Sequence, residues 1–427
     1  MNAALQNQAP VACDVLIIGA GPAGMAAALA AAPSGARITL VDDNPTPGGQ
    51  IWRDGAQAKL PASARKYRVD LAKHANITVL SGTRVAAVLG PKQLLLENTE
   101  QGSVITYQTA IVCTGARELL LPFPGWTLPG VTGAGGLQAL IKGGMPVAGQ
   151  RIVVAGSGPL LLAAAATARA AGATVVRIAE QAPWAQVMAF GAGLVRWPGK
   201  IAQAATLASP HYRANSFVRA VQGDNRVESV SLQVGTHNAQ IACDRVACGF
   251  GLVPNTQLAQ ALGLALDAQH GIAVDAYQAS SVPDHFAAGE CTGFGGSERA
   301  LVQGAIAGLA AVREADRAQA LWPQAARWNR FASHLATHFA LRPELSTLAQ
   351  DDTIVCRCED VRMGQLQGMG HWVEAKLQTR CGMGACQGRV CGAALQHLKG
   401  WQQPAPRMPM VPTRIQTLAQ IGPMELP

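Results

Sequence analysis

The chain has 427 residues, of which 49% are hydrophobic and 14% charged, and its formal net charge is +8. This length is enough for two or three domains with sizeable cores. The Lys and Arg residues are scattered and aromatic residues make up 5% of the chain, which argues against nucleic-acid binding. We expect the mildly basic surface to face an acidic partner subunit.

The N-terminal part of the chain does not predict a secretory signal or a membrane span. Residues 1–13 lack a basic start followed by an apolar core. Residues 15–32 are apolar over about the length of a membrane span, but a glycine turn interrupts them, which favours a buried strand followed by a helix. Five dispersed cysteines in apolar surroundings are typical of reduced core thiols, so we expect a cytoplasmic protein. These are Cys13, Cys113, Cys243, Cys248 and Cys291.

A βαβ unit is predicted first, with strands at residues 14–18 and 37–41 and a helix between them. In the connecting turn, Gly19 permits the sharp bend, Gly21 lets backbone approach a pyrophosphate, and Gly24 lets the helix pack on the strand. The N–H groups at the helix N-terminus would then face the phosphates. Asp42, 23 residues after Gly19, is placed to accept hydrogen bonds from ribose hydroxyls. The predicted dinucleotide site thus contains Gly19, Gly21, Pro22, Ala23, Gly24, Asp42 and Asp43.

A second unit of the same kind is predicted from residue 151. A strand at 152–155 leads into a turn containing Gly156 and Gly158, followed by an Ala-rich helix and a strand that ends at Glu180. Leu161 occupies the third glycine position, so the signal is weaker than in the first unit. Two interpretations stay open, a second nucleotide site or an empty, structural one.

Two further turns complete the pattern, Thr114-Gly115 after a strand and Gly289-Glu290 before a helix at about 299–316. The two units and these turns resemble the two-dinucleotide-domain flavoproteins of the glutathione and thioredoxin reductase type. The resemblance implies an α/β fold in which Gly289-Glu290 closes an FAD site. It also implies a discontinuous FAD-binding domain at 12–145 and 256–320, with a second nucleotide domain at 146–255. No cysteine pair follows the first unit as in disulfide reductases, and Cys243 and Cys248 fall in a strand pattern, so thiol–disulfide chemistry is not expected.

Five cysteines gather in the last fifth of the chain: Cys356, Cys358, Cys381, Cys386 and Cys391. Thiolates at such close spacing hold zinc or an iron–sulfur cluster. The glycines between them allow backbone N–H groups to point at sulfur, which stabilises an anionic cluster. Zinc remains the alternative, whereas disulfides do not suit a cytoplasmic chain. We therefore predict a helical linker at 321–350, a cysteine module with an iron–sulfur cluster at 351–402 and a Pro-rich tail at 403–427.

The cysteine module is similar to the bacterioferritin-associated-ferredoxin-like 2Fe-2S domain. Together with the stretches at 41–53, 121–131 and 289–298, it makes residues 12 to about 420 resemble the alpha, FAD-binding subunit of heteromeric amino-acid and opine dehydrogenases. That family includes D-hydroxyproline dehydrogenase, octopine and nopaline oxidases and the FAD subunit of hydrogen cyanide synthase. Heterotetrameric sarcosine oxidase has a related architecture.

The resemblance implies a set of site residues. The cluster ligands would be Cys356, Cys358, Cys386 and Cys391, and an alternative register that uses Cys381 stays open. Some relatives hold NAD or ATP where others hold FAD, and NAD or ATP at Gly156 and Gly158 also remains an option. Around the FAD, the first-unit residues would be joined by Gly48, Gly49, Gln50, Arg53, Thr114, Gly115, Gly289 and Glu290.

The resemblance also implies a division of labour. A beta subunit resembling glycine or D-amino-acid oxidases would oxidise a substrate C–N bond with its own FAD, and an FMN would lie at the subunit interface. This chain would pass the electrons through flavin and 2Fe-2S to a quinone or another acceptor, which could attach it peripherally to the inner membrane. The presence of a small third subunit stays open, as does the identity of the amino acid, imino acid or opine.

The sequence contains no clear acid–base dyad, so we predict no catalytic residue in this chain. Two other interpretations remain. One is a self-contained NAD(P)H-dependent FAD/2Fe-2S reductase that uses the second nucleotide unit. The other is a non-redox subunit with zinc at the cysteines.

Overall fold

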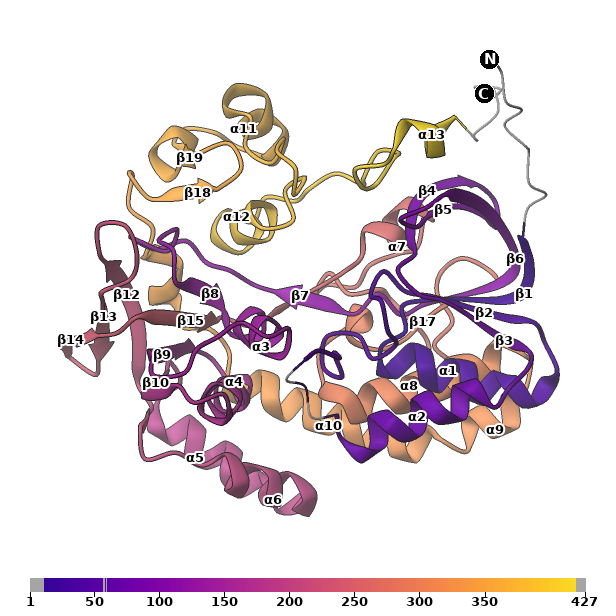
Figure 1. Ribbon diagram of the computed structural model, residues 1–427, viewed down its shortest axis with the longest axis horizontal. Helices are drawn as coiled ribbons and strands as arrows, with labels where there is room; N and C mark the ends of the chain where they lie inside the picture. The colour runs from indigo at the N-terminus through magenta and orange to yellow at the C-terminus, as the bar shows by residue number, and fades with distance from the viewer. Residues whose placement is uncertain (1–10, 57, 59, 420–427) are drawn as a thin grey trace.

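The computed structural model describes residues 11–419 except 57 and 59, and has two α/β units side by side with a smaller cysteine-containing module above them (Figure 1). This confirms the predicted fold class of two dinucleotide-binding units. Within the described part of the chain, no helix combines the length and apolar composition needed to cross a membrane.

The first unit is built on a seven-stranded sheet in the order β3-β2-β1-β6-β5-β4, with β17 paired to β6. The strands β1, β2, β3, β6 and β17 pair in parallel, so their carboxyl ends share one edge. The strands are β1 (Val11–Ile18), β2 (Ile38–Val41), β3 (Ile77–Leu80), β4 (Arg84–Gly90), β5 (Gln93–Glu97), β6 (Gly102–Val112) and β17 (His285–Ala287).

Helices α1 (Pro22–Ala31), α2 (Ala62–Ala72) and α8 (Gly296–Ala311) lie together below this sheet in Figure 1. Two glycines of α8 bring it unusually close to α1. A Cβ at Gly304 would lie 2.1 Å from the carbonyl oxygen of Ala23, and one at Gly308 would lie 2.2 Å from that of Ala27. The small side chains of both helices therefore fix the position of the start of α1.

The second unit has a five-stranded sheet in the order β11-β10-β9-β15-β8. It begins earlier than residue 146, because β8 pairs with β15 through Val131 and Val246. The sheet strands are β8 (Val131–Gly133), β9 (Arg151–Gly156), β10 (Thr174–Glu180), β11 (Tyr212–Arg213) and β15 (Arg245–Gly249). An antiparallel sheet adds β12 (Ser216–Gln222), β13 (Ser229–Val234) and β14 (His237–Ala242), and the helices are α3 (Ala134–Lys142), α4 (Leu160–Ala170), α5 (Trp184–Gly193) and α6 (Pro198–Leu207).

The two units are joined by an antiparallel ribbon of β7 (Ala116–Glu118) and β16 (Leu252–Pro254). The short helices α7 (Gln257–Ala261) and α9 (Ala315–Gln319) flank the second part of the first unit. In the expected linker, helix α10 (Trp322–His338) packs on α5 and α8, and a 3-10 turn follows at Pro343–Thr347.

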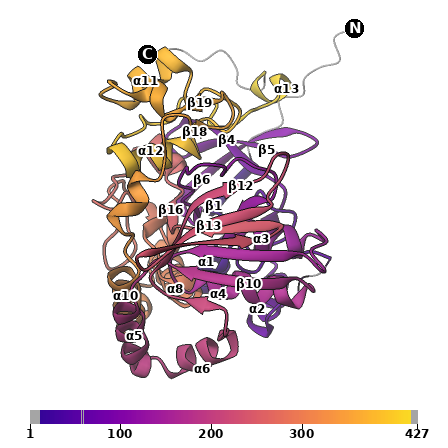
Figure 2. The same ribbon diagram turned by 90° about the vertical axis from the view of Figure 1, so that its left-hand side faces the viewer.

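The cysteine module has its own small core, formed by Val355, Leu366, Trp372, Leu395 and Trp401. Its elements are β18 (Ile354–Cys356), β19 (Val361–Arg362), α11 (Trp372–Thr379) and α12 (Cys391–Lys399). The tail then returns to the first unit, where α13 (Ile415–Leu418) lies near β4 and β5 in both views (Figure 2). The last part of the predicted tail, 420–427, and residues 1–10 lie outside the described residues.

Candidate functional site

The first glycine turn has the geometry that a dinucleotide turn requires. Gly19 has a φ of 106°, and a Cβ there would lie 2.2 Å from the carbonyl oxygen of Cys113. A Cβ at Gly24 would lie 1.8 Å from the carbonyl oxygen of Gly19. Any side chain at either position would therefore collide with backbone, which explains the glycines at the bend and at the helix–strand contact.

Gly21 differs because a Cβ there would meet nothing closer than the Cα of Gly49, 3.9 Å away. It is the N-cap of α1, which has neither a side-chain cap nor an acidic residue in its first turn. Gly48 closes the second loop over the turn by donating its N–H to the oxygen of Ala20 at 2.8 Å. The uncapped N–H groups of α1 are thus available to an anion such as a pyrophosphate.

The two acids after β2 have different surroundings. Asp42 is buried, and its carboxylate accepts the backbone N–H of Ala20 at 2.5 Å. It also accepts the backbone N–H of Asn44 at 2.8 Å and the Asn44 side-chain amide at 2.7 Å. Among the residues that the structure describes, Asp43 accepts one hydrogen bond, from the Asn44 side chain at 3.0 Å. Loss of hydration and the negative charge of Asp42 raise the pKa of Asp43. The carboxylate of Asp42, which we predict to bind ribose hydroxyls, also supports the turn, and the exposed Asp43 beside it has more available oxygens.

Arg53 supplies a cation beside these acids. Its Nη2 donates to Asn44 Oδ1 at 2.9 Å, while its Nε is buried without a hydrogen-bond partner among the described residues. A buried donor without a partner costs free energy unless a ligand pairs with it. An oxygen of a bound phosphate would satisfy this nitrogen, so Arg53 fits the role implied for it.

The two later turns lie at the same edge of the sheet. Gly289, with a φ of 85°, contacts the start of α1, where its Cβ would lie 2.8 Å from that of Ala23. Burial raises the pKa of the adjacent Glu290. Gly115 has a φ of 64° and open space where a Cβ would point. The structure therefore gathers the predicted first-site residues around one turn: Gly19, Gly21, Pro22, Ala23, Gly24, Asp42, Asp43, Gly48, Gly49, Gln50, Arg53, Thr114, Gly115, Gly289 and Glu290.

The second glycine turn is engaged by an acid from its own unit. Glu180 is buried and accepts the N–H of Gly158 at 2.7 Å and the N–H of Ala182 at 2.9 Å. Burial raises its pKa to about 7, against the effect of these hydrogen bonds. The Glu180 carboxylate thus already accepts the N–H of Gly158, which would otherwise be free to donate to a ligand.

The chain also covers this turn from outside with the segment 339–342, which the sequence analysis did not foresee. Ser157 donates its hydroxyl to the oxygen of Phe339 at 2.8 Å, and a Cβ at Gly158 would lie 3.7 Å from the Phe339 side chain. Gln181 donates to the oxygen of Ala340 at 3.0 Å and accepts the N–H of Arg342 at 3.1 Å. No local motif marks this segment, because its partners lie more than 150 residues earlier in the sequence.

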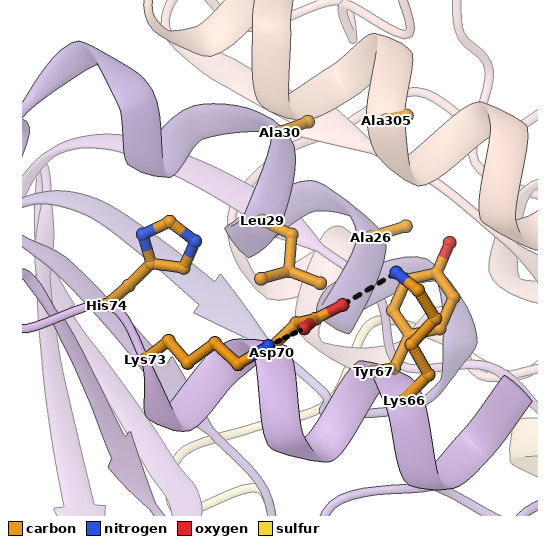
Figure 3. Close-up of a pocket in the computed structure, with 9 residues that line it drawn as sticks. All are labelled: Ala26, Leu29, Ala30, Lys66, Tyr67, Asp70, Lys73, His74 and Ala305. Atoms are coloured by element: carbon orange, nitrogen blue, oxygen red, sulfur yellow. Dashed lines mark hydrogen bonds and ion pairs between the residues drawn. The ribbon is translucent and has the colours of Figure 1, made fainter.

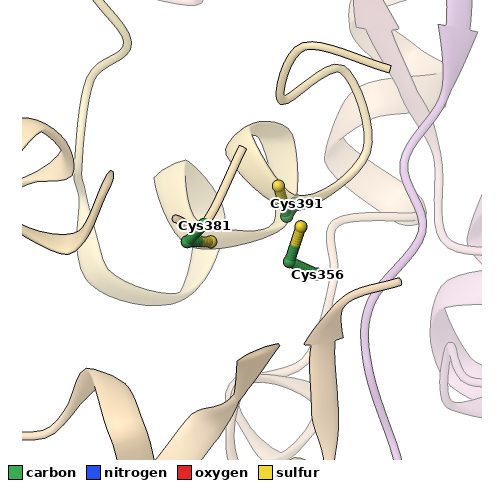
Figure 4. A group of neighbouring side chains, drawn as sticks. All are labelled: Cys356, Cys381 and Cys391. Atoms are coloured by element: carbon green, nitrogen blue, oxygen red, sulfur yellow. The ribbon is translucent and has the colours of Figure 1, made fainter. Parts of the chain in front are cut away.

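Three buried cysteines meet in the small module (Figure 4). The Sγ atoms of Cys356, Cys381 and Cys391 lie within 4.8 Å of one another. The backbone N–H of Gly382 donates to the Cys356 sulfur at 3.5 Å, as expected for a glycine-rich loop around thiolates. Cys381, which the sequence left as an alternative ligand, therefore lies beside two of the four predicted ligands.

The other two predicted ligands form a second group. Cys358 is exposed and Cys386 half-buried, and Cys386 lies close enough to influence the pKa of Cys358. The nearby Gly384 makes this approach feasible, because a Cβ there would lie 2.3 Å from the Cβ of Cys358. The four predicted ligands thus form two neighbouring pairs, Cys356 with Cys391 and Cys358 with Cys386. Two pairs of thiolates fit the donor set of a 2Fe-2S cluster, which takes four cysteines.

Arg117 on β7 connects the first site to the cysteine module. Its Nε donates to the oxygen of Arg389 at 3.0 Å, and its Nη1 donates to Asn255 Oδ1 at 3.0 Å. Asn255 in turn donates to the oxygen of Thr114 at 2.9 Å. Burial, with a smaller contribution from the positive charge of Arg389, lowers the pKa of Arg117 to about 10, so it stays charged at neutral pH.

A hollow of about 410 Å³ lies elsewhere, between α1, α2 and α8 (Figure 3). Asp70 at its rim accepts hydrogen bonds from Lys66 and Lys73, both at 2.8 Å, which lower its pKa to about 2. The hollow contains none of the predicted site residues, and its charged groups pair with one another. We assign it no function.

Comparison with known proteins agrees with this geometry. Residues 13–320 match the pyridine nucleotide-disulphide oxidoreductase family. The chain is 31% identical to hydrogen cyanide synthase subunit HcnB of Pseudomonas aeruginosa, over 95% of this chain and 98% of that protein. It is also 31% identical to a subunit of opine oxidase from Agrobacterium tumefaciens, over 96% of this chain and 92% of that protein.

Among solved structures, the fold is similar to L-proline dehydrogenase from P. horikoshii, with a TM-score of 0.71 at 19% identity over 96% of this chain and 80% of that one. Thioredoxin reductase from T. acidophilum matches with a TM-score of 0.57 at 23% identity, over 71% of this chain and 99% of that one. These likenesses confirm the two-unit flavoprotein architecture. The chain therefore belongs to the pyridine nucleotide-disulphide oxidoreductase family, and within it is homologous to HcnB and to the opine oxidase subunit.

Proposed function

We propose that this chain is the electron-transfer subunit of a heteromeric flavin dehydrogenase. A partner beta subunit, resembling glycine or D-amino-acid oxidases and carrying its own FAD, oxidises the C–N bond of an amino acid, imino acid or opine. An FMN lies at the interface between the two subunits. This chain receives the electrons and delivers them to a quinone or another acceptor, which would place it in the cytoplasm or at the inner membrane surface.

One observation carries the proposal: a buried group of three cysteines, with Cys358 and Cys386 beside it, in a module that contacts the ribbon beside a dinucleotide turn. When bound, FAD would exchange electrons in pairs and a 2Fe-2S cluster would exchange them singly. The N–H groups at the start of α1 and the guanidinium of Arg53 would hold the pyrophosphate, and Asp43 would accept ribose hydroxyls. Cys356, Cys358, Cys386 and Cys391 would hold the cluster.

Two features argue against a self-contained NAD(P)H reductase. In the second unit, Glu180 already accepts the N–H of Gly158, and the segment 339–342 covers the turn. A nicotinamide nucleotide would have to displace both. A non-redox subunit would bind zinc with the same thiolates, so measuring iron and zinc distinguishes it from the electron-transfer subunit.

The test is an absorption spectrum of the anaerobically purified chain, with iron, zinc and acid-released nucleotide measured on the same sample. We expect flavin bands with added absorbance toward the red and about two irons per chain, the content of one 2Fe-2S cluster. Flavin with zinc and no iron would refute the proposal that electrons leave this chain through an iron–sulfur cluster. Reduction of both centres by an amino acid or opine only when the beta subunit is added would support the division of labour.

A further inference from the structure

Arg117 lies at the point where three parts of the molecule meet. It belongs to β7 of the inter-domain ribbon, and its side chain reaches the loop between Cys386 and Cys391 by donating to the oxygen of Arg389 at 3.0 Å. It also donates to the oxygen of Pro254 at 3.2 Å and to Asn255 Oδ1 at 3.0 Å. One planar guanidinium therefore binds the cysteine loop and the second ribbon strand at the same time.

The contact continues to the first site through Asn255. Its side chain donates to the oxygen of Thr114 at 2.9 Å, its backbone N–H donates to the oxygen of Gly115 at 3.0 Å, and its own oxygen accepts the Thr114 hydroxyl at 2.6 Å. The Thr114-Gly115 turn thus both donates to and accepts from Asn255, and Asn255 in turn accepts a hydrogen bond from Arg117. A short chain of hydrogen bonds links the turn beside the dinucleotide site to the loop beside the cysteines.

The charge of Arg117 is not neutralised locally. No carboxylate among the described residues pairs with it, and its hydrogen-bond acceptors are carbonyl and amide oxygens. Glu118, the next residue, points away and accepts the N–H groups of Gly135 and Gly136 at 2.7 and 2.8 Å. An uncompensated cation in a partly buried place favours added negative charge nearby, because the low dielectric weakens screening. Reduction of a cluster adds one such charge.

We propose that Arg117 is a positioning residue for electron transfer, which fixes the cysteine module to the ribbon and favours the reduced state of the centre that this module holds. The inference rests on the proposed function for its redox part. Its positioning part depends on the hydrogen bonds of this chain alone.

The test uses two variants of the full-length chain. Arg117→Lys keeps the charge but cannot bind Arg389 and Asn255 together, whereas Arg117→Gln removes the charge and keeps one donor. We expect both to retain wild-type iron, because no cysteine is changed, and both to show faster hydrogen exchange at residues 387–392. In a redox titration we expect Arg117→Gln to shift the oxidised-to-reduced ratio of the iron centre by about tenfold toward oxidised, about 59 mV for a one-electron couple. Arg117→Lys should shift it less.

Arg245→Gln is the matched control. Arg245 is also half-buried and also bonded to a neutral group, Gln150 Oε1, but it lies at the other end of β15 from the ribbon. It should change neither the exchange at 387–392 nor the titration. Wild-type exchange and titration in both Arg117 variants would overturn the inference while leaving the proposed function intact. Wild-type protein without iron would refute the proposed function, and the exchange measurement would still decide whether Arg117 positions the module.

Discussion

At the scale of single residues, substitutions at two glycines of the first turn can distinguish ligand binding from folding. A side chain at Gly21 has room in the folded chain, whereas one at Gly24 would meet the oxygen of Gly19 at 1.8 Å. We therefore expect Gly21→Val to fold normally but to purify without flavin, because its methyl groups occupy the pyrophosphate position. Gly24→Val should instead lower the free energy of unfolding by about 3 kcal/mol or prevent folding.

The measurement is acid-released nucleotide per chain together with a denaturation curve for each variant. Gly21→Val that keeps one FAD per chain would remove this turn from the proposed site. Unfolding of Gly21→Val would mean that the turn has a structural function beyond ligand binding.

The cysteines allow a similar comparison between two neighbours of the same loop. The proposed pairs use Cys386 and leave Cys381 as a buried neighbour, although its sulfur lies within 4.8 Å of those of Cys356 and Cys391. We expect Cys386→Ser to lose iron and Cys381→Ser to keep it, because serine can replace a buried thiol that binds no metal. Iron per chain and the visible spectrum decide this. Loss of iron from Cys381→Ser as well would instead support the alternative register, in which Cys381 and Cys386 are ligands.

At the scale of elements, the glycine pattern predicted the first unit because each of its roles is local in the sequence. It could not predict which acid is available, because that depends on the hydrogen bonds of Asp42 to Ala20 and Asn44 in the folded loop. Nor could it predict contacts between distant segments. Arg117 and Arg389 are 272 residues apart, and no motif links the two. The start of the second unit before residue 146 could not be predicted either, because it depends on the long-range pairing of β8 with β15.

The segment after α10 yields a prediction of its own. The carbonyl oxygens of Phe339 and Ala340 accept hydrogen bonds from Ser157 and Gln181. The glycine turn of the second unit therefore already has hydrogen-bond partners within the chain. We expect NADH and NADPH to reduce the bound flavin slowly, at a rate that does not saturate with their concentration. Stopped-flow absorbance at the flavin band measures this, and dithionite serves as the positive control. Rapid, saturable bleaching by either nucleotide would show that the segment opens, and would favour the self-contained reductase.

A double variant, Phe339→Ala with Arg342→Ala, tests whether the segment is what excludes the nucleotide. It removes the side chain over Gly158 and the guanidinium that donates to Asn215 Oδ1 at 2.6 Å. If the cover excludes the ligand, this variant should gain measurable NADH affinity in calorimetry. No gain would leave the exclusion with Glu180, which accepts the N–H of Gly158, and with the main-chain hydrogen bonds of the segment, which this variant keeps.

At the scale of the whole molecule, the chain returns to its first unit after the cysteine module. Glu97 at the end of β5 is buried and receives this tail: it accepts the N–H of Arg414 at 2.9 Å and the hydroxyl of Thr417 at 2.8 Å. Arg84 binds its other oxygen. The chain on the far side of the module is thus anchored to the first unit, and one buried carboxylate lies at this junction.

This junction makes a pH-dependent prediction. Burial alone would raise the pKa of Glu97, but the hydrogen bonds from Arg414, Arg84 and Thr417 outweigh it and bring the pKa down to about 2. A carboxylate whose pKa is depressed on folding adds stability above its unfolded pKa, about 4.3, and that stability is lost as the pH falls toward 2. Glu97→Gln should therefore lower the free energy of unfolding by about 1–3 kcal/mol at pH 7. The difference from the wild type should shrink steadily below about pH 4.5.

Chemical denaturation of both proteins between pH 7 and the acid limit of the native state measures this difference. Asp70→Asn is the control, because Asp70 also has a pKa of about 2 but pairs with two exposed lysines at the hollow and has no hydrogen bond to the described part of the tail. Exposed ion pairs contribute little, so this control should leave stability nearly unchanged. A difference between Glu97→Gln and the wild type that does not vary with pH would mean that the tail is held by its apolar contacts, such as that of Met410 with the first-unit core, and not by the buried carboxylate.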